Sequence, residues 1–478
     1  MILSLIFLSL NLSTLFHSAI ARGSAHHRSK NSGYIESTYG RPRRRLNSQT
    51  EFKMSEEVYI EKLEKLAQGY MSNTDLEREM KEFNNRCRNI SRLYSMVHTE
   101  LLVTTKKFQM LAFLYVRFGG SKIGIAEISI GKSALGVPLW ALEISDLPGK
   151  IEAEPAFKFI GNVHGDEPVG RELLLLLANW LCNNYMKDPL VTLIVDNVHL
   201  HILPTMNPDG FSLRRRGNAN NIDLNRDFPD QGALVANYPW DGTEDKKRYY
   251  YGCPDDQTFR FLASLYSRSH YNMSLSQEFP GGITNGAYPI YGGMQDWNYI
   301  NSGCFELTLE ISDDKWPNAT ELPTLWEYNR MSMLNLVASL VKTGLHGQIS
   351  SSDNGRPLPA SIAIRGINST VAATTKFADY HRLLAPGGKY EVIATMPGYR
   401  PKSACVVLGQ SAITVDFVLD PETNSEGSKP LEDSGCYFDN TFGVQVMDFM
   451  PVPRLEIPRR VRSNHLNQKQ TTPVSKRA

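Results

Sequence analysis

The feature that most constrains the fold is an apolar strand pattern that runs through a short turn into a long apolar helix pattern. Residues 156–185 read AFKFIGNVHGDEPVGRELLLLLANWLCNNY, and residues 192–211 repeat the apolar strand and the turn as TLIVDNVHLHILPTMNPDGF. Strands that alternate with helices predict a largely parallel sheet with helices on both faces. In α/β sheets of this class, functional sites gather at the carboxyl ends of the strands.

The length and a change of pattern divide the chain into two folded domains. At 478 residues the chain exceeds one compact core, and its net charge of +1 with 41% hydrophobic residues favours neither a nucleic-acid partner nor wholesale disorder. The α/β pattern occupies residues 51–343, and its start contains a capping-box pattern at Thr74 and Glu77. Residues 344–421 show short alternating strands separated by Gly-containing turns, which predicts an all-β sandwich.

Both ends of the chain read as segments outside the folded domains. Residues 1–21 form an apolar run that ends in Ala-Ile-Ala, which predicts a cleaved signal peptide and a secreted or secretory-pathway protein; a signal anchor is the alternative. Residues 22–50 form a basic leader and residues 422–478 a linker and tail, both expected to be disordered. Past the signal peptide, no stretch is long and apolar enough to span a membrane.

Glycosylation and disulfide signals fit the secretory route. Four Asn-x-Ser/Thr sequons follow the signal peptide and suit surface sites on a glycoprotein. The six cysteines are scattered without Cys-x-x-Cys spacing, so one or two disulfides are expected and their pairing stays open.

His164 and Glu167 are the first candidate metal ligands. They lie three positions apart, directly after the strand pattern of residues 156–160. An imidazole and a carboxylate so spaced in a tight turn can face one cation, and two histidines, one glutamate and a water form a known catalytic zinc set. A single His-x-x-Glu pattern also arises by coincidence, so further residues must decide its meaning.

Three further segments carry polar groups suited to binding and catalysis. The segments NPDGF (207–211) and RRRGNANNIDLNRDFPD (214–230) place arginines and asparagines in turns, where a guanidinium can bind a carboxylate through two hydrogen bonds. The segment GCFELTLEIS ends its apolar strand with Glu310, and a carboxylate there is costly unless it is paired or catalytic.

Together these motifs resemble the zinc metallocarboxypeptidases of the N/E (regulatory) subfamily, including the plant carboxypeptidase D-like proteins. The resemblance rests on HGDEPVGRELLL, NPDGF, DLNRDFPD, GALVANYPWD, GGMQDWNY and FELTLE, in that order, followed by the sandwich. It implies an α/β/α mixed sheet followed by a transthyretin-like sandwich, and a single Zn2+ ion. It also implies a monomeric hydrolase that removes C-terminal Lys or Arg from peptides and proteins, a form of peptide processing.

The resemblance also implies a role for each matching residue. His164 and Glu167 would bind zinc, Glu310 would act as general base, and Arg216 would stabilise the oxyanion. The remaining positions would bind substrate: Asn225 and Arg226 the terminal carboxylate, Tyr288 as a cover over it, and Asp241 with Gln295 the basic side chain.

The sequence departs from the family pattern at three places. In the family a helix and a strand ending in NLHGG precede ALVANYP and supply the third zinc ligand, whereas here Gln231 is followed directly by Gly232. Residues 96–129 form an atypical insertion, and NGAYPIYGG lacks two residues. A sheet missing one strand and one helix is therefore expected, and alternative splicing or a faulty gene model would account for all three breaks.

Loss of the third ligand leaves competing hypotheses. His199, His201 and His270 are candidate replacements, but structural roles are favoured for them because the family has histidines at the same places without using them for zinc. The chain is then either an impaired carboxypeptidase or an inactive pseudo-carboxypeptidase that binds peptides. A deacylase that cleaves small molecules would also use His-x-x-Glu, but NPDGF, DLNRDFPD and the sandwich argue against it.

Overall fold

The computed structural model describes residues 2–8, 56–95, 131–225, 235–241, 250–285, 293–422 and 436. The leader (22–50), the insertion (96–129) and nearly all of the tail lie outside these ranges, so the predictions made for them stay predictions. Two predicted substrate-binding residues, Arg226 and Tyr288, also lie outside the described residues.

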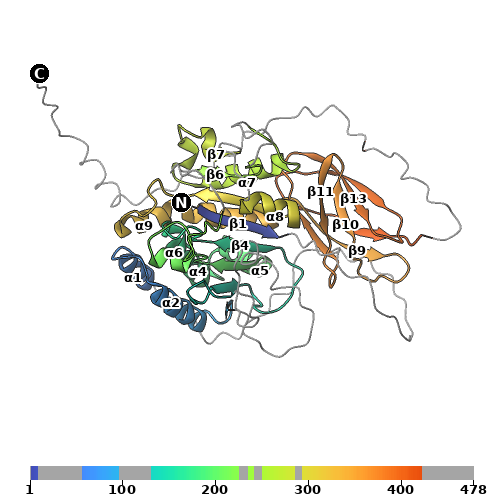
Figure 1. Cartoon of the computed structure of the whole chain (residues 1–478). Coiled ribbons are helices and arrows are strands. Elements are labelled where there is room, and N and C mark those ends of the chain that lie inside the picture. Colours follow the sequence, from blue (N-terminus) through green and yellow to red (C-terminus); the bar gives the residue numbers. More distant parts are fainter. Residues whose placement is uncertain are drawn as a thin grey trace, which may run out of the picture.

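One eight-stranded sheet organises the described part of the first domain (Figure 1). Its strands are β1 (Ile2–Leu8), β2 (Ser91–Ser95), β3 (Trp140–Ile144), β4 (Ala156–Ile160), β5 (His199–Leu203), β6 (Val235–Asn237), β7 (Ile283–Thr284) and β8 (Phe305–Glu310). The helices are α1 (Glu56–Leu66), α2 (Asn73–Arg86), α4 (Val169–Asn184), α5 (Pro189–Asn197), α6 (Pro208–Ser212), α7 (Asp256–Ser269), α8 (Met294–Ser302) and α9 (Leu322–Lys342), with 3-10 turns η1 (Met273–Leu275), η2 (Pro280–Gly282) and η3 (Ala319–Glu321).

The sheet is mixed, which confirms the α/β mixed sheet implied by the family resemblance and shows that the largely parallel sheet predicted from the alternation of strands and helices is wrong. Its order is β2-β3-β5-β4-β1-β8-β6-β7, and among these described strands only the pairs β4–β5 and β6–β7 are parallel. The β4–β5 pair is parallel because α4 and α5 carry the chain back across the sheet, as a parallel connection requires. The other neighbouring strands run antiparallel.

Strand β1 occupies the place between β4 and β8. It pairs antiparallel with β4 from Ser4 to Leu8 and antiparallel with β8 from Ile2 to Phe7. These residues fall inside the predicted signal peptide, and one molecule cannot both lose residues 1–21 and keep β1. The signal peptide therefore stays a prediction, and its removal would leave β4 and β8 without a shared partner.

Apolar side chains cover both faces of the sheet, which explains the continuous apolar runs in the strand sequences. On one face Phe157, Phe159 and Leu200 pack in the main core with α4 and α9. On the other face Ile160 and Leu203 pack in a smaller core with Met294 of α8. None of the helices in the described part of the chain has the length and apolar character needed to span a bilayer.

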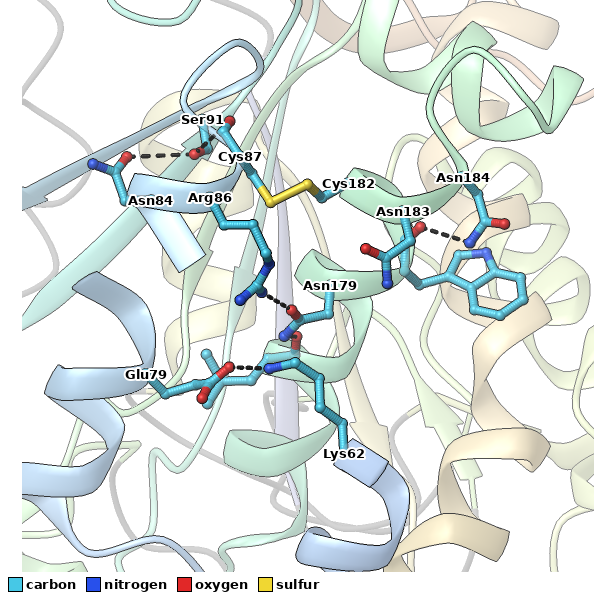
Figure 2. The surroundings of a disulfide bond; sticks show 12 residues. Lys62, Glu79, Asn84, Arg86, Cys87, Ser91, Asn179, Cys182, Asn183 and Asn184 are labelled. Atoms are coloured by element: carbon cyan, nitrogen blue, oxygen red, sulfur yellow. Dashed lines mark hydrogen bonds and ion pairs between the residues drawn. A yellow bond between two sulfur atoms is a disulfide. The ribbon is translucent and has the colours of Figure 1, made fainter. Parts of the chain in front are cut away.

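A disulfide between Cys87 and Cys182 fastens α2 to α4 (Figure 2). Beside it, the Arg86 guanidinium donates to the Asn179 side chain. Helix α2 begins at the cap Ser72, whose hydroxyl accepts from the Asp75 N–H, so the predicted capping box at Thr74 is displaced by two residues. A second disulfide joins Cys405 to Cys436, while Cys253 and Cys304 are buried thiols.

The second domain consists of two four-stranded sheets around a core of its own. One sheet has β10 (Ser361–Ile364), β11 (Ile367–Ala372), β13 (Lys389–Thr395) and β14 (Lys402–Val407); the other has β9 (Leu345–Ser351), β12 (Asp379–Arg382), β15 (Ile413–Thr414) and β16 (Phe417–Leu419). Residues of both sheets, among them Ile349, Ile362 and Phe417, share this core. The likeness to transthyretin stays a prediction.

A buried ion pair joins the sandwich to the α/β domain. Arg382 of β12 donates from Nη2 to Asp255 Oδ1 at 2.6 Å, and both side chains are fully buried. The Tyr299 hydroxyl donates to the other Asp255 oxygen at 2.7 Å, and the Arg382 guanidinium lies 5.6 Å from the centre of the Phe305 ring. The sandwich is thus held beside α7, α8 and β8, the elements that flank the candidate site.

Replacement of Arg382 by methionine is expected to destabilise the protein strongly. The change leaves the Asp255 carboxylate buried without its cation, which costs about 3–5 kcal/mol of unfolding free energy. Denaturant unfolding of the full chain measures the effect. Lys402→Met is the matched control, because its ion pair with Asp420 is exposed and should matter little. Equal stability losses in the two variants would contradict a special role for the buried pair.

Candidate active site

His164 and Glu167 lie together in the turn that follows β4. Their side chains are almost fully buried, and His164 Nδ1 lies 2.9 Å from Glu167 Oε2. The second imidazole nitrogen, Nε2, lies 3.2 Å from Asp223 Oδ1. A carboxylate on the far nitrogen is the usual arrangement behind a metal-binding histidine, because it fixes the ring and leaves the other nitrogen for the metal.

Close backbone packing fixes this turn. Gly165 approaches Gly210 so closely that a Cβ on Gly165 would lie 2.0 Å from the Gly210 carbonyl carbon, so neither NPDGF nor HGDEPVG has room for a side chain there. The Gly165 N–H and the Asn207 side-chain amide both donate to the Arg216 carbonyl, at 3.1 Å each. The segments that carry His164, NPDGF and Arg216 therefore form one rigid unit.

Arg216 completes a charged network around the pair. Its Nε donates to Asp223 Oδ2 at 2.9 Å, and its Nη1 lies 3.4 Å from Glu167 Oε1. Lys315 Nζ also lies near Glu167, at 3.9 Å from Oε1. Two cationic side chains thus face a carboxylate that has little exposure, which stabilises its charged form.

The network shifts the pKa values of its members. Burial works to lower the pKa of His164, but the carboxylates of Glu167 and Asp223 outweigh it and raise that pKa above its usual value. Burial works to raise the pKa of Asp223, but His164 and Arg216 lower it to about 2. Burial also works to raise the pKa of Glu167. The cations around Glu167, among them His164 and Arg216, outweigh burial and hold this pKa well below its usual range.

Glu310 ends β8 on the side of the sheet opposite the main core. Phe305, Leu307 and Leu309 point into that core, so the alternating positions of β8, namely Glu306, Thr308 and Glu310, share the other face. Ile2 of β1 and Val235 of β6 are the residues paired with Glu310. Asn225 is buried, and its side-chain oxygen accepts from the Met294 N–H at 2.8 Å.

Asp241 and Gln295 lie in the interior near the same face of β8. Both are 1% exposed. Asn237, which pairs with Thr308 of β8, donates to Asp241 Oδ1 at 2.7 Å, and the Asp241 N–H donates to the carboxylate of Asp296. Neither polar atom of the Gln295 side chain has a hydrogen-bond partner among the described residues.

The two zinc-ligand candidates fit part of a metal site. A histidine nitrogen facing a glutamate oxygen is the donor pair expected for two ligands of a catalytic zinc. Within the described ranges, the only group of three or more His, Cys, Asp or Glu residues close enough to hold one ion is Asp146, Glu152 and Glu154, which does not include them. A third protein ligand is therefore not found in the described part of the site.

The three candidate replacement histidines have other partners. His199 Nε2 is bonded to Glu143, His201 Nδ1 lies 2.9 Å from the Tyr94 hydroxyl, and the two rings stack 5.1 Å apart. His270 Nδ1 accepts from the Met273 N–H at 3.2 Å, and burial lowers the pKa of His270 to about 4. These contacts agree with structural roles for all three.

Comparison with known proteins identifies the family. The model of the family described as zinc carboxypeptidase matches residues 124–233 and 231–332, in two parts that meet where the absent histidine segment is expected. Carboxypeptidase SOL1 of Arabidopsis thaliana is 54% identical over 459 residues, covering 85% of this chain and 87% of the relative. The chain belongs to the zinc carboxypeptidase family. One Zn2+ ion is the metal of this family.

Animal members of the family are also similar. Human carboxypeptidase D is 40% identical over 372 residues, covering 66% of this chain and 27% of the longer relative. Carboxypeptidase E of Caenorhabditis elegans is 34% identical over 396 residues, covering 63% of this chain and 84% of the relative. The chain thus spans about a quarter of carboxypeptidase D and most of the other two.

Sequence reasoning missed three carboxylates that the structure brings into the site. Asp223 lies two positions before Asn225 in the DLNRDFPD motif, and Asp296 directly follows Gln295, so both sat inside motifs already quoted. Glu306 lies on the same face of β8 as Glu310, four residues earlier. Glu306 also lies inside the quoted motif FELTLE, and the period of two along this strand places it on the face of Glu310.

Proposed function

We propose that this zinc carboxypeptidase acts on peptides and proteins that end in Lys or Arg, and that this chain cleaves them weakly. The observation that carries the proposal is the placement of buried Asp241 and Gln295 beside the face of β8 that ends in Glu310. A buried carboxylate near the catalytic end of a strand favours a cationic side chain over an apolar one.

The residues of the chain divide the work of binding and catalysis. Arg216, which donates to Asp223, would stabilise negative charge on the scissile carbonyl, and Glu310 would accept and return a proton. Asn225, whose side chain accepts from the Met294 N–H, would bind the terminal carboxylate together with Arg226. Tyr288 would cover the bound chain end. The roles of Arg216, Glu310 and Asn225 rest on the motif resemblance as well as on the geometry, and those of Arg226 and Tyr288 on the resemblance alone.

His164 and Glu167 would hold the zinc ion. When bound, zinc polarises the scissile carbonyl and lowers the pKa of a water molecule. Asp223 keeps the far nitrogen of His164 occupied, so that Nδ1 stays directed toward Glu167. With two protein ligands in place of three, the affinity for zinc and hence the rate of cleavage are expected to be low.

A cleavage assay with matched peptides tests this proposal. Peptides ending in Arg, Lys and Leu are incubated with the full chain and added zinc, with and without a chelator. Slow cleavage of the Arg and Lys peptides, stopped by the chelator and absent for Leu, is the expected result. Asp241→Asn is expected to reduce cleavage of the Arg peptide at least about tenfold. Equal cleavage of all three peptides would refute the basic specificity.

A second candidate is a peptide-binding protein without hydrolytic activity. The absence of a third ligand for His164 and Glu167 within the described residues favours it. Asn225, Asp241 and Gln295 would still bind a chain ending in Lys or Arg. Binding of the Arg peptide with no cleavage at saturating zinc would establish this candidate in place of the first.

We also propose that the chain enters the secretory pathway and is glycosylated. The disulfides Cys87–Cys182 and Cys405–Cys436 need an oxidising compartment. The asparagines of all four sequons, Asn89, Asn272, Asn318 and Asn368, are exposed. Expression in a secretory host followed by enzymatic deglycosylation should lower the mass, and each Asn→Gln change should remove part of that shift. An unchanged mass would contradict the proposal.

A further inference from the structure

Near Asp241 the structure contains a buried carboxylate, Glu306, to which the motif resemblance assigned no role. Its side chain is 0% exposed. The Asn298 side-chain amide donates to one of its oxygens, while the other, Oε1, has no hydrogen-bond partner among the described residues. An acceptor buried in this way is costly, so its retention needs an explanation.

Three elements bring Glu306 together with Asp241 and Asp296. Helix α8 packs on β8 and carries both Asp296 and Asn298, the partner of Glu306. Strand β6 pairs with β8 and places Asn237, which binds Asp241, beside Thr308. Asp241 and Asp296 are the two carboxylates that act on Glu306. The buried thiol of Cys304 is also close to Glu306, and the buried Lys158 of β4 is in line with it across β1. We refer to Glu306, Asp241 and Asp296 as the acidic trio.

The acidic trio lies along the face of β8 that ends in Glu310. Glu306 and Glu310 lie on one face of the strand, four residues and therefore about 13 Å apart. A peptide whose scissile bond lies at Glu310 can extend its last side chain along this face to the level of Thr308, between Asp241 and the side chain of Glu306. Gln295, whose buried amide has no partner among the described residues, lies in the first turn of α8 next to Asp296.

We propose that Glu306, together with Asp241 and Asp296, binds the cationic end of a C-terminal Lys or Arg side chain and sets the preference for a cation over an apolar group. This inference rests on the proposed function, since it names a further residue for the same substrate. The unpartnered Oε1 is the acceptor that the guanidinium or ammonium group would use.

The charge state of Glu306 gives the proposal a distinctive signature. Burial first, and then the charges of Asp241 and Asp296, raise the pKa of Glu306 well above its usual range, against the effect of the Asn298 hydrogen bond. A bound cation stabilises the ionised form and lowers the pKa again. Between these two pKa values, binding of a peptide that ends in Arg should therefore release a proton, whereas a peptide that ends in Leu should release none.

Calorimetric binding of matched peptides to the full chain tests the proposal. A chelator prevents cleavage, and buffers with different ionisation enthalpies report the protons released. We expect the wild type to prefer the Arg peptide over the Leu peptide by at least about tenfold, and Glu306→Gln to lose most of that preference and the proton release. Glu278→Gln makes the same substitution at an exposed position and should change neither.

The outcomes separate this inference from the proposed function. If Glu306→Gln keeps the preference and the proton release while Asp241→Asn loses the preference, the role of Glu306 is refuted and the basic specificity stands. If the wild type shows no preference for Arg, the proposed function fails and the inference fails with it. If Glu306→Gln does not fold, the calorimetric measurement on the wild type is the test. A wild type that binds the Arg peptide without releasing a proton would overturn the proposal.

Discussion

Insertion of a strand ending in Asn-Leu-His-Gly-Gly between Gln231 and Gly232 is expected to raise peptide hydrolysis at least about 100-fold. The resemblance to the N/E carboxypeptidases implies this segment, and the family match breaks into two parts at residues 231–233. The inserted histidine would join His164 and Glu167 as a third ligand. Mutation of an outer partner of a metal site reduces metal affinity or activity roughly 10–100-fold. Restoration of a direct ligand should have a larger effect.

The fold offers the inserted strand one suitable place. A strand whose carboxyl end reaches both His164, after β4, and Glu310, at the end of β8, must lie between those two strands. Strand β1 now occupies that place and runs antiparallel to both, with Ile2 opposite Glu310. An inserted strand would therefore have to displace β1.

Zinc content and cleavage of a peptide ending in Arg measure the effect of the insertion. About one zinc per chain and a chelator-sensitive gain in rate are expected. The same segment with alanine in place of its histidine is the matched control and should fold without the gain. Glu310→Gln in the restored chain should remove about 100–10,000-fold of the rate. A restored chain that binds no zinc would contradict the metal assignment of His164 and Glu167.

Removal of residues 1–21 is expected to prevent the α/β domain of this chain from folding stably. It deletes β1 and so leaves backbone groups unpaired on the facing edges of β4 and β8. Each buried unpaired group costs about 1–3 kcal/mol. The summed cost of several such groups exceeds the free energy of unfolding of a typical domain, which is roughly 5–15 kcal/mol.

Limited proteolysis and thermal unfolding of residues 22–478 against the full chain measure this loss. In the chain with the inserted strand, the same truncation should have little effect, because the new strand pairs with β4 and β8. A protein recovered from a secretory host that begins at Arg22 and unfolds as cooperatively as the full chain would show that β1 is dispensable. The signal peptide prediction would then hold without conflict.

The ordered motifs of the sequence were sufficient to predict the family and its α/β domain. HGDEPVG, NPDGF and DLNRDFPD are patterns of a few consecutive residues, so they can be recognised before their contacts with one another are known. The strand, turn and helix of residues 156–185 were also predictable, since continuous apolar runs report burial on both faces of a sheet. Zinc, the metal of the family, followed from the same motifs.

Contacts between distant segments were not predictable from the sequence. The mixed strand order, the use of Ile2–Leu8 as a central strand and the Arg382–Asp255 junction each join parts of the chain far apart in sequence. The acidic trio is the clearest case, because Asp241, Asp296 and Glu306 lie on a loop, a helix and a strand. Local periodicity can place a residue on one face of its own helix or strand. The three carboxylates come together only through the packing of α8 and β6 on β8, because the distance between side chains on different elements depends on tertiary structure.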